Sequence, residues 1–367
     1  MQLLSLKTPL KGHQVEARDH LINNTVAGLN HPMGSGKSLA ALSAAIEVMR
    51  EDDDIRTLIL APKRVCTTWM DQISRHINGA STYLAIDKKK AQNVSRTARF
   101  VIASYHSCEH LPVDLNCVVV IADECHTFRN PNTKLFGRVK VWASTAAWFW
   151  GLSGTHIVNK VADGRALQLV AESREKAQIH HLSAAVKKEL LDSLPPLKID
   201  FYELEFSDEE EPEFEAIKTS HHHHLTVMTW QLMYAASCPT KMGGLLDLIE
   251  KHPGDNFIIF SRFVSVRDTV MEFLAGEGGV TDDFRTFQRS GGLLVTSYKS
   301  FGVGIDCSMA HHVVFLDLPW TAADFDQAVA RAHRPGNERC NVHVFVFPKT
   351  PELRVLQIID DKRALQW

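Results

Sequence analysis

Residues 31–38, with the sequence His-Pro-Met-Gly-Ser-Gly-Lys-Ser, carry side chains that could bind the phosphates of a nucleotide. Gly34 and Gly36 would let backbone N–H groups approach phosphate oxygens. Lys37 could reach the β- and γ-phosphates, and the hydroxyl of Ser38 could bind Mg²⁺. The segment departs from the full G-x-x-x-x-G-K-S/T pattern, because a histidine replaces the first glycine. Alone, the loop would be a weak signal.

A second element with chemical potential lies further along the chain, where an apolar run at 118–122 ends in Asp123 and Glu124. Such a run is typical of a buried parallel strand, whose carboxyl end would deliver both acids to a nucleotide. Asp123 would then bind the magnesium ion, and Glu124 would accept a proton from the attacking water. Acidic pairs usually lie on solvated surfaces, so this pair alone would mislead. The loop and the pair together, in this order, predict nucleotide hydrolysis.

Short apolar, β-prone runs alternate with helix-like segments in the first part of the chain. Strands that alternate with helices are typical of a parallel sheet wrapped by helices on both faces. In such a sheet the glycine-rich loop would follow a strand and open a helix, where anions bind. We expect strands at 57–61, 100–104, 118–122 and 148–153, and helices at 39–50 and 67–76.

A second set of alternating segments follows later and contains no glycine-rich loop of its own. The predicted fold class is therefore α/β, with two mostly parallel sheets, each covered by helices on both faces. At 367 residues the chain is long enough for two such domains. The later strands are expected at 256–261, 292–297, 312–317 and 341–347, with helices at 264–274 and 322–332.

Residues 161–240 differ in composition from both predicted sheets, because they contain an acidic run at 207–213. This composition favours a connector or helical protrusion over a core. The predicted domains are therefore 1–160, 161–240 and 241–367. Four consecutive histidines at 221–224 could indicate a metal site, but we favour a solvated or helix-initiating run.

The overall composition limits the class of protein. Seven scattered cysteines without a C-x-x-C pair are typical of the reducing cytosol, and a nucleoid or nuclear location fits as well. No run of about 18 apolar residues is present, so no membrane span is expected, and the first residues are too polar for a secretory signal. The net charge of −3 does not by itself indicate nucleic-acid binding. Basic residues at 88–90, Arg96 and Arg99 could contact phosphates or form a solvated surface.

Other segments of the first part match a known set of motifs in type and order. They are Leu10-Lys-Gly-His-Gln14; 58–62 with Trp69; 102–105, which includes Ser104; and 152–155, which includes Ser153 and Thr155. With the loop and the acidic pair, they resemble superfamily-two helicase-like ATPases, specifically the Swi/Snf-type DNA translocases. The resemblance implies that Gln14 recognises adenine. It also implies that the four other named side chains contact nucleic acid or couple hydrolysis to lobe movement.

The second part of the chain resembles the same family. Arg331 and Arg334 fall in its arginine-finger motif. Because they are three apart on a predicted helix, they would share a face, and their guanidinium groups would neutralise phosphoryl charge in the transition state. The other residues that the resemblance assigns are Gly304 and Asp306 for nucleotide binding, and Thr296 and Gln327 for coupling or nucleic-acid contact.

The resemblance implies two RecA-like lobes, an ATP-binding lobe at 1–160 and a helicase C-terminal lobe at 241–367, with the nucleotide cleft between them. Catalysis would then need closure of the cleft, because Lys37 and Glu124 belong to one lobe and the arginines to the other. Residues implied to hold ATP and Mg²⁺ are Gln14, Met33, Gly34, Ser35, Gly36, Lys37, Ser38, Asp123, Gly304 and Asp306, with Ser38 and Asp123 as metal ligands.

The leading functional hypothesis is a DNA-stimulated ATPase that translocates on double-stranded DNA and remodels protein–DNA complexes. We expect a minimal form without accessory domains, directed by a protein partner. One alternative is a helicase that separates strands or migrates branches on DNA or RNA. Another is a nucleotide-switched binding module with little turnover. Departures from the family pattern at His156, Val158, Pro335 and Asn337 favour this last alternative.

Overall fold

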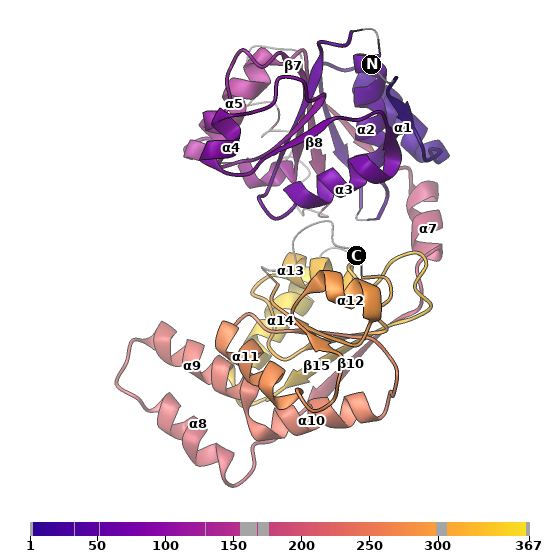
Figure 1. Ribbon diagram of the computed structural model, residues 1–367. Helices are drawn as coiled ribbons and strands as arrows, with labels where there is room; N and C mark the ends of the chain where they lie inside the picture. Colours follow the sequence, from indigo (N-terminus) through magenta and orange to yellow (C-terminus); the bar gives the residue numbers. More distant parts are fainter. Residues whose placement is uncertain are drawn as a thin grey trace. The chain divides into compact units, whose positions relative to one another are not determined.

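The computed structural model describes residues 3–32, 34–50, 52–128, 130–154, 167, 176–298 and 307–364. The chain divides into two compact units, Met1–Leu190 and Leu191–Trp367 (Figure 1). We call them unit 1 and unit 2 and describe each by itself. Within the described ranges, no helix is long and apolar enough to cross a lipid bilayer.

Unit 1 is built on a parallel sheet of seven strands, in the spatial order β5-β6-β3-β7-β8-β2-β9. The strands are β2 (Val26–Asn30), β3 (Arg56–Ala61), β5 (Thr82–Ala85), β6 (Phe100–Ser104), β7 (Cys117–Asp123), β8 (Trp148–Ser153) and β9 (Gln178–His181). A small antiparallel pair, β1 (Ser5–Leu6) with β4 (Ile77–Asn78), lies outside this sheet.

The helices of unit 1 connect these strands. They are α1 (Gly12–Ile22), α2 (Lys37–Met49), α3 (Cys66–His76), α4 (Lys88–Gln92) and α5 (Lys134–Thr145), with short 3₁₀ turns η1 (Cys108–His110) and η2 (Cys125–Phe128). The middle residues of the central strands are apolar, and residues 58–61 of β3 are fully buried. A strand with both side-chain directions buried is what helices on both faces of a parallel sheet produce.

Unit 2 contains a parallel sheet of six strands, in the order β10-β15-β14-β11-β13-β12. The strands are β10 (Leu197–Glu203), β11 (Phe257–Phe260), β12 (Val280–Thr281), β13 (Leu293–Thr296), β14 (His312–Phe315) and β15 (Cys340–Val346). The helices are α8 (Glu210–Lys218), α9 (His224–Ser237), α10 (Pro239–Glu250), α11 (Val264–Phe273), α12 (Phe284–Ser290), α13 (Ala322–Val329) and α14 (Pro351–Ala364), while α7 (Ala184–Asp192) crosses the boundary between the units.

The predicted fold class, α/β with two mostly parallel sheets flanked by helices, is confirmed. The middle segment differs from a plain connector. Its strand β9 joins the sheet of unit 1 beside β2, and all seven residues of β10 pair with β15 in unit 2. β9 has only four residues, too few to show a period, whereas β10 alternates apolar and charged residues from Leu197 to Phe201, a strand pattern that the composition of the segment outweighed.

The acidic run at 207–213 also belongs to the folded part of unit 2. It forms the start of α8, where negative charge is favourable at a helix N-terminus. Glu210 is buried and accepts hydrogen bonds from the backbone N–H of Ser207 and from both the N–H and the hydroxyl of Thr240. In Figure 1 the α8–α9 pair lies beside α10 and α11.

A pair of glycines leaves room for a packed layer over the sheet of unit 1. Gly28 on β2 lies opposite Gly151 on β8, and a Cβ at Gly28 would lie 2.6 Å from Ile179 Cδ1 and 2.8 Å from Leu167 Cδ1. Gly28→Ala should therefore overpack this layer and lower the free energy of unfolding by about 1–3 kcal/mol. Denaturant titration followed by tryptophan fluorescence measures the change.

Gly137→Ala in α5 is the matched control, because a Cβ there would meet nothing within 4 Å. Alanine is the better helix former, so we expect this variant to gain about 0.5–1 kcal/mol. Equal loss of stability in both variants would contradict the packing argument.

Candidate functional site

The glycine-rich loop connects the carboxyl end of β2 to the start of α2, as the sequence predicts. Gly34 and Gly36 both have φ of 77°, a backbone conformation that glycine adopts without strain. Gly36 is the residue that precedes α2, so Lys37 and Ser38 occupy the first turn, where backbone N–H groups favour an anion. Met33 lies outside the described residues.

Helix α1 fixes the loop from the side. Gln14 Nε2 donates a hydrogen bond to the carbonyl oxygen of Ser35 (3.1 Å), and His13 Nε2 lies 2.9 Å from the same oxygen. Gln14 Oε1 accepts from the backbone N–H of Lys11 at 2.9 Å. A Cβ at Gly36 would lie 2.0 Å from Gln14 Nε2, so the loop can approach α1 only with glycine there. The Nε2 end of the Gln14 amide thus supports the loop and the Oε1 end caps α1, in addition to the adenine role that the resemblance implies.

The histidine that replaces the first glycine of the loop pattern is buried and pairs with a half-buried histidine. His31 is 2% exposed, and its Nε2 lies 2.8 Å from Nδ1 of His180, which comes from β9. Burial, followed by the neighbouring His180 and Lys37, lowers the pKa of His31 to about 3. His31 is therefore neutral at neutral pH and connects the loop to the edge strand through a hydrogen bond.

Asp123 and Glu124 lie at the carboxyl end of β7, on the same edge of the sheet as the loop. Asp123 Oδ2 accepts a hydrogen bond from Trp69 Nε1 at 2.8 Å, and Oδ1 accepts one from the backbone N–H of Glu124 at 3.0 Å. Burial, followed by the neighbouring Glu124, raises the pKa of Asp123 to about 6, while Lys37 and the Trp69 hydrogen bond act in the opposite direction. The electrostatic effect of Lys37 on Asp123 indicates that the loop and the acidic pair lie close together and form one site.

Glu124 has an unusual backbone conformation, with φ of 50°. A non-glycine residue in this region is strained, and such strain is typical of functional positions. The side chain is 2% exposed, and His126 Nδ1 lies 3.3 Å from its Oε2. The 3₁₀ turn η2 that follows at Cys125 holds the carboxylate next to Asp123. This geometry suits a group held in one orientation to accept a proton.

The donor set at this edge fits a magnesium ion. Asp123 supplies carboxylate oxygens, and Ser38 supplies a hydroxyl at the start of α2. Oxygen ligands of this kind are the ones that Mg²⁺ prefers. Burial, followed by the negative charge of Glu124, raises the pKa of Asp123, and a divalent cation at this position would offset both effects.

Three residues implied to contact nucleic acid or to couple hydrolysis are buried in unit 1. Trp69 and Ser153 are each 2% exposed, and Ser104 is fully buried with its hydroxyl 2.8 Å from that of Ser107. Direct contact of these side chains with a nucleic acid does not fit this burial. Trp69 instead positions the carboxylate of Asp123. Thr155 lies outside the described residues.

Unit 2 corrects one local expectation. Helix α13 ends at Val329, so Arg331 and Arg334 lie in the turns beyond it and do not share a helical face. Pro335 and Gly336, with φ of 96° at the glycine, follow directly and are incompatible with a continuing helix. Arg331 is 1% exposed, whereas Arg334 is half-buried and its Nε donates to the carbonyl oxygen of Ala330.

The remaining predicted residues of unit 2 are only partly described. Thr296 is buried at the carboxyl end of β13, and its carbonyl oxygen accepts a hydrogen bond from the backbone N–H of Ser261. Gln327 lies half-buried in α13. Gly304 and Asp306 lie outside the described residues. The structure thus brings the glycine-rich loop and the acidic pair together within unit 1. The two arginines belong to unit 2 and are described only there.

Comparison with known proteins identifies two domains along this chain. Residues 20–174 match the SNF2-related domain, and residues 240–336 match the helicase conserved C-terminal domain. The second match includes both predicted arginine-finger residues, and the first includes the loop and the acidic pair. The chain therefore belongs to the SNF2-related, helicase-like ATPases.

The chain is similar to several curated relatives over part of their length. It is 33% identical over 144 residues to an uncharacterized ATP-dependent helicase of Schizosaccharomyces pombe, and 31% identical over 143 residues to the DNA repair protein RAD5 of Yarrowia lipolytica. Each alignment covers 34% of this chain and 14% of the relative. The CHD3-type chromatin-remodeling factor PICKLE of Arabidopsis thaliana is 21% identical over 477 aligned residues, with 98% of this chain and 34% of that protein covered.

Among solved structures, the chain is similar to the SWI2/SNF2 ATPase core of Sulfolobus solfataricus in complex with double-stranded DNA. The TM-score is 0.45 at 18% sequence identity, with 100% of this chain and 94% of that chain covered.

Some residues of the site carry no motif that would reveal them. His13 and His180 are examples, since each acts only through a contact with the loop. His180 comes from a segment that the composition assigns to a connector. Trp69 is different, because the resemblance points to the residue, and the structure supplies its partner.

Removing the indole donor should disturb the acidic pair. Trp69→Phe keeps a buried ring but leaves Asp123 Oδ2 without its 2.8 Å hydrogen bond. We expect the Mg²⁺ concentration for half-maximal ATPase activity to rise about tenfold, as losses of such supporting contacts do at metal sites. The measurement is a magnesium titration of ATPase rate without nucleic acid.

The matched control is Trp142→Phe, because Trp142 is also buried and donates its Nε1–H to a carbonyl oxygen, that of Cys108. It should leave the magnesium titration unchanged. A loss of nucleic-acid stimulation in Trp69→Phe with unchanged magnesium dependence would instead favour the contact role.

The burial of His31 predicts that the protein loses stability in acid. The pKa of His31 falls from 6.5 in the unfolded chain to about 3 in the folded chain. Between these two pH values, His31 is protonated in the unfolded chain and neutral in the folded chain. Stability should therefore fall as pH drops below about 6.5 and continue to fall towards pH 3. Between pH 7 and pH 5 this costs about 2 kcal/mol, a loss that His31→Gln should remove. Denaturant titrations at both pH values test this, and His110→Gln should keep the wild-type loss.

Proposed function

We propose that this chain is an ATP-dependent motor of the Swi/Snf type, stimulated by double-stranded DNA, that moves along the duplex and remodels protein–DNA complexes. The observation that carries the proposal is the meeting of the glycine-rich loop with Asp123 and Glu124 at one edge of the first sheet. The two domain matches support it, because relatives of this family are named as helicases, a repair protein and a chromatin-remodeling factor.

In this proposal each residue of unit 1 has a defined task. The backbone N–H groups at the start of α2 and the ammonium of Lys37 bind the phosphates of ATP. Glu124 orients the attacking water and accepts its proton. Asp123 and Ser38 hold Mg²⁺, which when bound would neutralise charge on the phosphates. Trp69 holds the Asp123 carboxylate in place.

The arginines of unit 2 complete the catalytic set. Arg331 and Arg334 would neutralise charge on the transferring phosphoryl group, a contribution of about 10³–10⁵-fold in other phosphoryl-transfer proteins. We propose that they act when ATP draws the ATP-binding part at 1–160 and the C-terminal part at 241–367 together. The burial of Arg331 supports a residue that is held in a set orientation rather than a solvated ion pair.

Double-stranded DNA is the proposed track, and a protein partner would direct the motor. All seven cysteines are buried in the reduced thiol form, which supports a location in the reducing cytosol or the nucleus. The alignments with the Schizosaccharomyces pombe helicase and with RAD5 cover only 14% of those two proteins. The activities of the whole relatives are therefore extended to this chain only as part of the proposal.

The role of Glu124 predicts a separation of binding from turnover. Glu124→Gln keeps the size of the side chain but cannot accept a proton, so the ATPase rate should fall by about 10²–10⁴-fold. Binding of ATP, measured by equilibrium titration with a fluorescent analogue, should stay within about twofold. The control Glu109→Gln changes a half-exposed carboxylate paired with Arg138 in the same unit and should keep full activity.

The choice of track is decided by steady-state ATPase rates without nucleic acid and with duplex DNA, single-stranded DNA or RNA at fixed salt. Strong stimulation by duplex DNA without strand separation on a forked substrate supports the proposal. Preference for single strands or RNA, with unwinding, indicates a helicase. Rates near background under all conditions indicate a nucleotide-switched module and contradict the proposed motor.

A further inference from the structure

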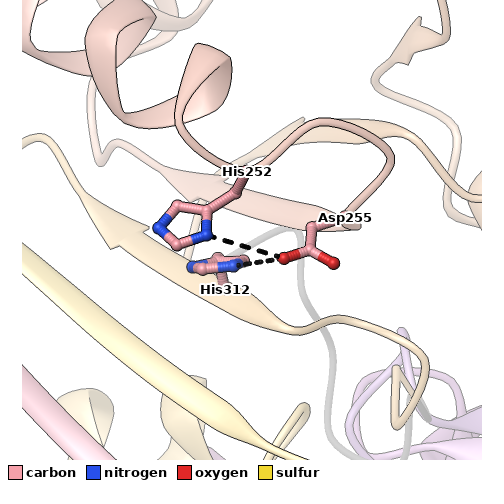
Figure 2. A group of neighbouring side chains, drawn as sticks. All are labelled: His252, Asp255 and His312. Carbon is pink, nitrogen blue, oxygen red and sulfur yellow. Dashed lines mark hydrogen bonds and ion pairs between the residues drawn. The ribbon is translucent and has the colours of Figure 1, made fainter.

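A cluster of histidines surrounds one carboxylate in unit 2, apart from every residue assigned above (Figure 2). His312 Nε2 lies 2.9 Å from Asp255 Oδ2, and His252 Nδ1 lies 3.8 Å from the same oxygen. One ligand atom from each of these three residues lies within 4.8 Å of the other two. His312 is fully buried, while the other two are half-buried, so the cluster has one face towards the core and one towards solvent.

We propose that His252, Asp255 and His312 bind a single zinc ion. Two imidazole nitrogens and one carboxylate oxygen are a common ligand set for Zn²⁺, which leaves a fourth position for water. With metal–ligand bonds of about 2.0–2.2 Å, tetrahedral ligands lie about 3.3 Å apart. The observed 2.9 Å and 3.8 Å separations bracket this value. The ligand atoms of His252 and His312 lie within 4.8 Å of each other, so rotation of the half-buried His252 side chain towards the other two residues would close the site.

The residues behind His312 provide the support that a metal-binding histidine needs. His312 Nδ1 lies 2.8 Å from Nε2 of His343 on β15, and His343 Nδ1 lies 3.0 Å from the hydroxyl of Tyr202 on β10. Metal-binding histidines almost always donate their second ring N–H to an acceptor, and the neutral imidazole of His343 can be that acceptor. His312 also stacks on Phe257, with ring centroids 4.4 Å apart, which fixes the plane of its imidazole.

The hydrogen-bond chain is complete both with and without the metal. In its absence, the Asp255 carboxylate accepts from His312 Nε2–H, so His312 Nδ1 must accept from His343, and His343 Nδ1 from Tyr202. With Zn²⁺ on His312 Nε2, His312 Nδ1–H donates to His343, whose Nδ1–H donates to the Tyr202 oxygen. The two imidazoles exchange tautomers, no proton is lost, and neither ring is left without a partner.

The three residues lie at the amino ends of the strands of unit 2, whereas Thr296, a predicted coupling residue, lies at the carboxyl end of β13. Asp255 precedes β11, and His312 begins β14, so both lie at the amino ends of neighbouring parallel strands. Four-residue strands separate them by about 13 Å from the carboxyl ends. A zinc ion here would connect the turn after α10, which carries His252, to the amino end of β14, which carries His312. The site is remote from the predicted nucleotide chemistry, so ATP hydrolysis does not depend on it directly.

Arg339 and His311 share the carboxylate but do not belong to the ligand set. Arg339 Nη2 lies 2.5 Å from both oxygens of Asp255, and its side chain is 51% exposed. His311 Nδ1 accepts the backbone N–H of Asn256 and faces Asp255 Oδ1, the other oxygen. An exposed arginine can rotate into solvent at small cost, so it is a competitor that zinc displaces from Oδ2.

The test must first remove another source of zinc binding in this chain, the exposed histidines at 221–224. A background chain replaces three of them with glutamine and changes His223 to Asn, because the His223 side chain caps α9. In this full-length background, calorimetric titration with Zn²⁺ should show one saturable site per chain. Zinc should also raise the melting temperature of the background chain.

His252→Ala is the deciding variant, because the His252 side chain is 39% exposed and its removal leaves the buried chain intact. It should weaken zinc binding at least about tenfold while leaving the metal-free melting temperature unchanged. Asp255→Asn should weaken binding similarly. The control His110→Ala removes a histidine beside a single carboxylate, that of Glu109, and should bind zinc as the background does.

No saturable site in the background chain overturns the proposal. A loss of less than tenfold in a folded His252→Ala variant overturns it as well, as does an equal loss in His110→Ala. Without added zinc, the background chain should hydrolyse ATP at the rate of the unsubstituted chain. Failure of the zinc proposal can therefore be distinguished from failure of the proposed motor function.

Discussion

The burial of two adjacent acids at the end of one strand is the constraint around which unit 1 is organised. Removing a carboxylate from water is costly, and two together cost more, so the surrounding groups must offset the charge. The offset here comes from the Trp69 indole, the backbone N–H of Glu124 and the ammonium of Lys37. The pKa of Asp123 nevertheless remains raised, which means that the chain alone does not fully compensate the pair. A site left in this condition is suited to a cationic ligand.

Unit 2 has a comparable buried acid, whose pKa is also raised by burial but which has a guanidinium partner. Asp317 follows β14 and is 1% exposed. Its carboxylate accepts hydrogen bonds from the Ser261 hydroxyl and from both the backbone and the side chain of Arg262, whose guanidinium lies 4.0 Å from the centre of the Trp320 ring. A full guanidinium partner makes Asp317 a structural group. Asp123 has no such partner at hydrogen-bond distance among the described residues, and this difference separates a supporting carboxylate from one that can bind a ligand.

Continuous apolar runs predicted the central strands well, because a strand buried on both faces must be apolar at every position. Edge strands were not predicted: β9 is four residues long and contains two histidines, and β10 alternates with charged residues. The end of α13 was also predicted wrongly. A helix was expected at 322–332, but it ends at Val329, five residues before Arg334, and Pro335 and Gly336 then follow. The motifs predicted which residues gather at the first sheet, but not which atoms they use. Gln14 and Trp69 show this, since each is bonded to another member of the site.

The two edges of a parallel sheet differ in what they can hold. Carboxyl ends meet loops that open helices, so anion sites and the acids that serve them gather there, as with the loop before α2 and the pair after β7. Amino ends carry no such helix openings, and polar side chains there must satisfy one another. At the amino end of β14, His312, His343 and Tyr202 do so in a single chain that ends on Asp255. Because the hydrogen bonds among His312, His343 and Tyr202 can reverse together, the position between Asp255 and His312 is the point of that chain where an ion can replace a proton without leaving a buried group unpaired.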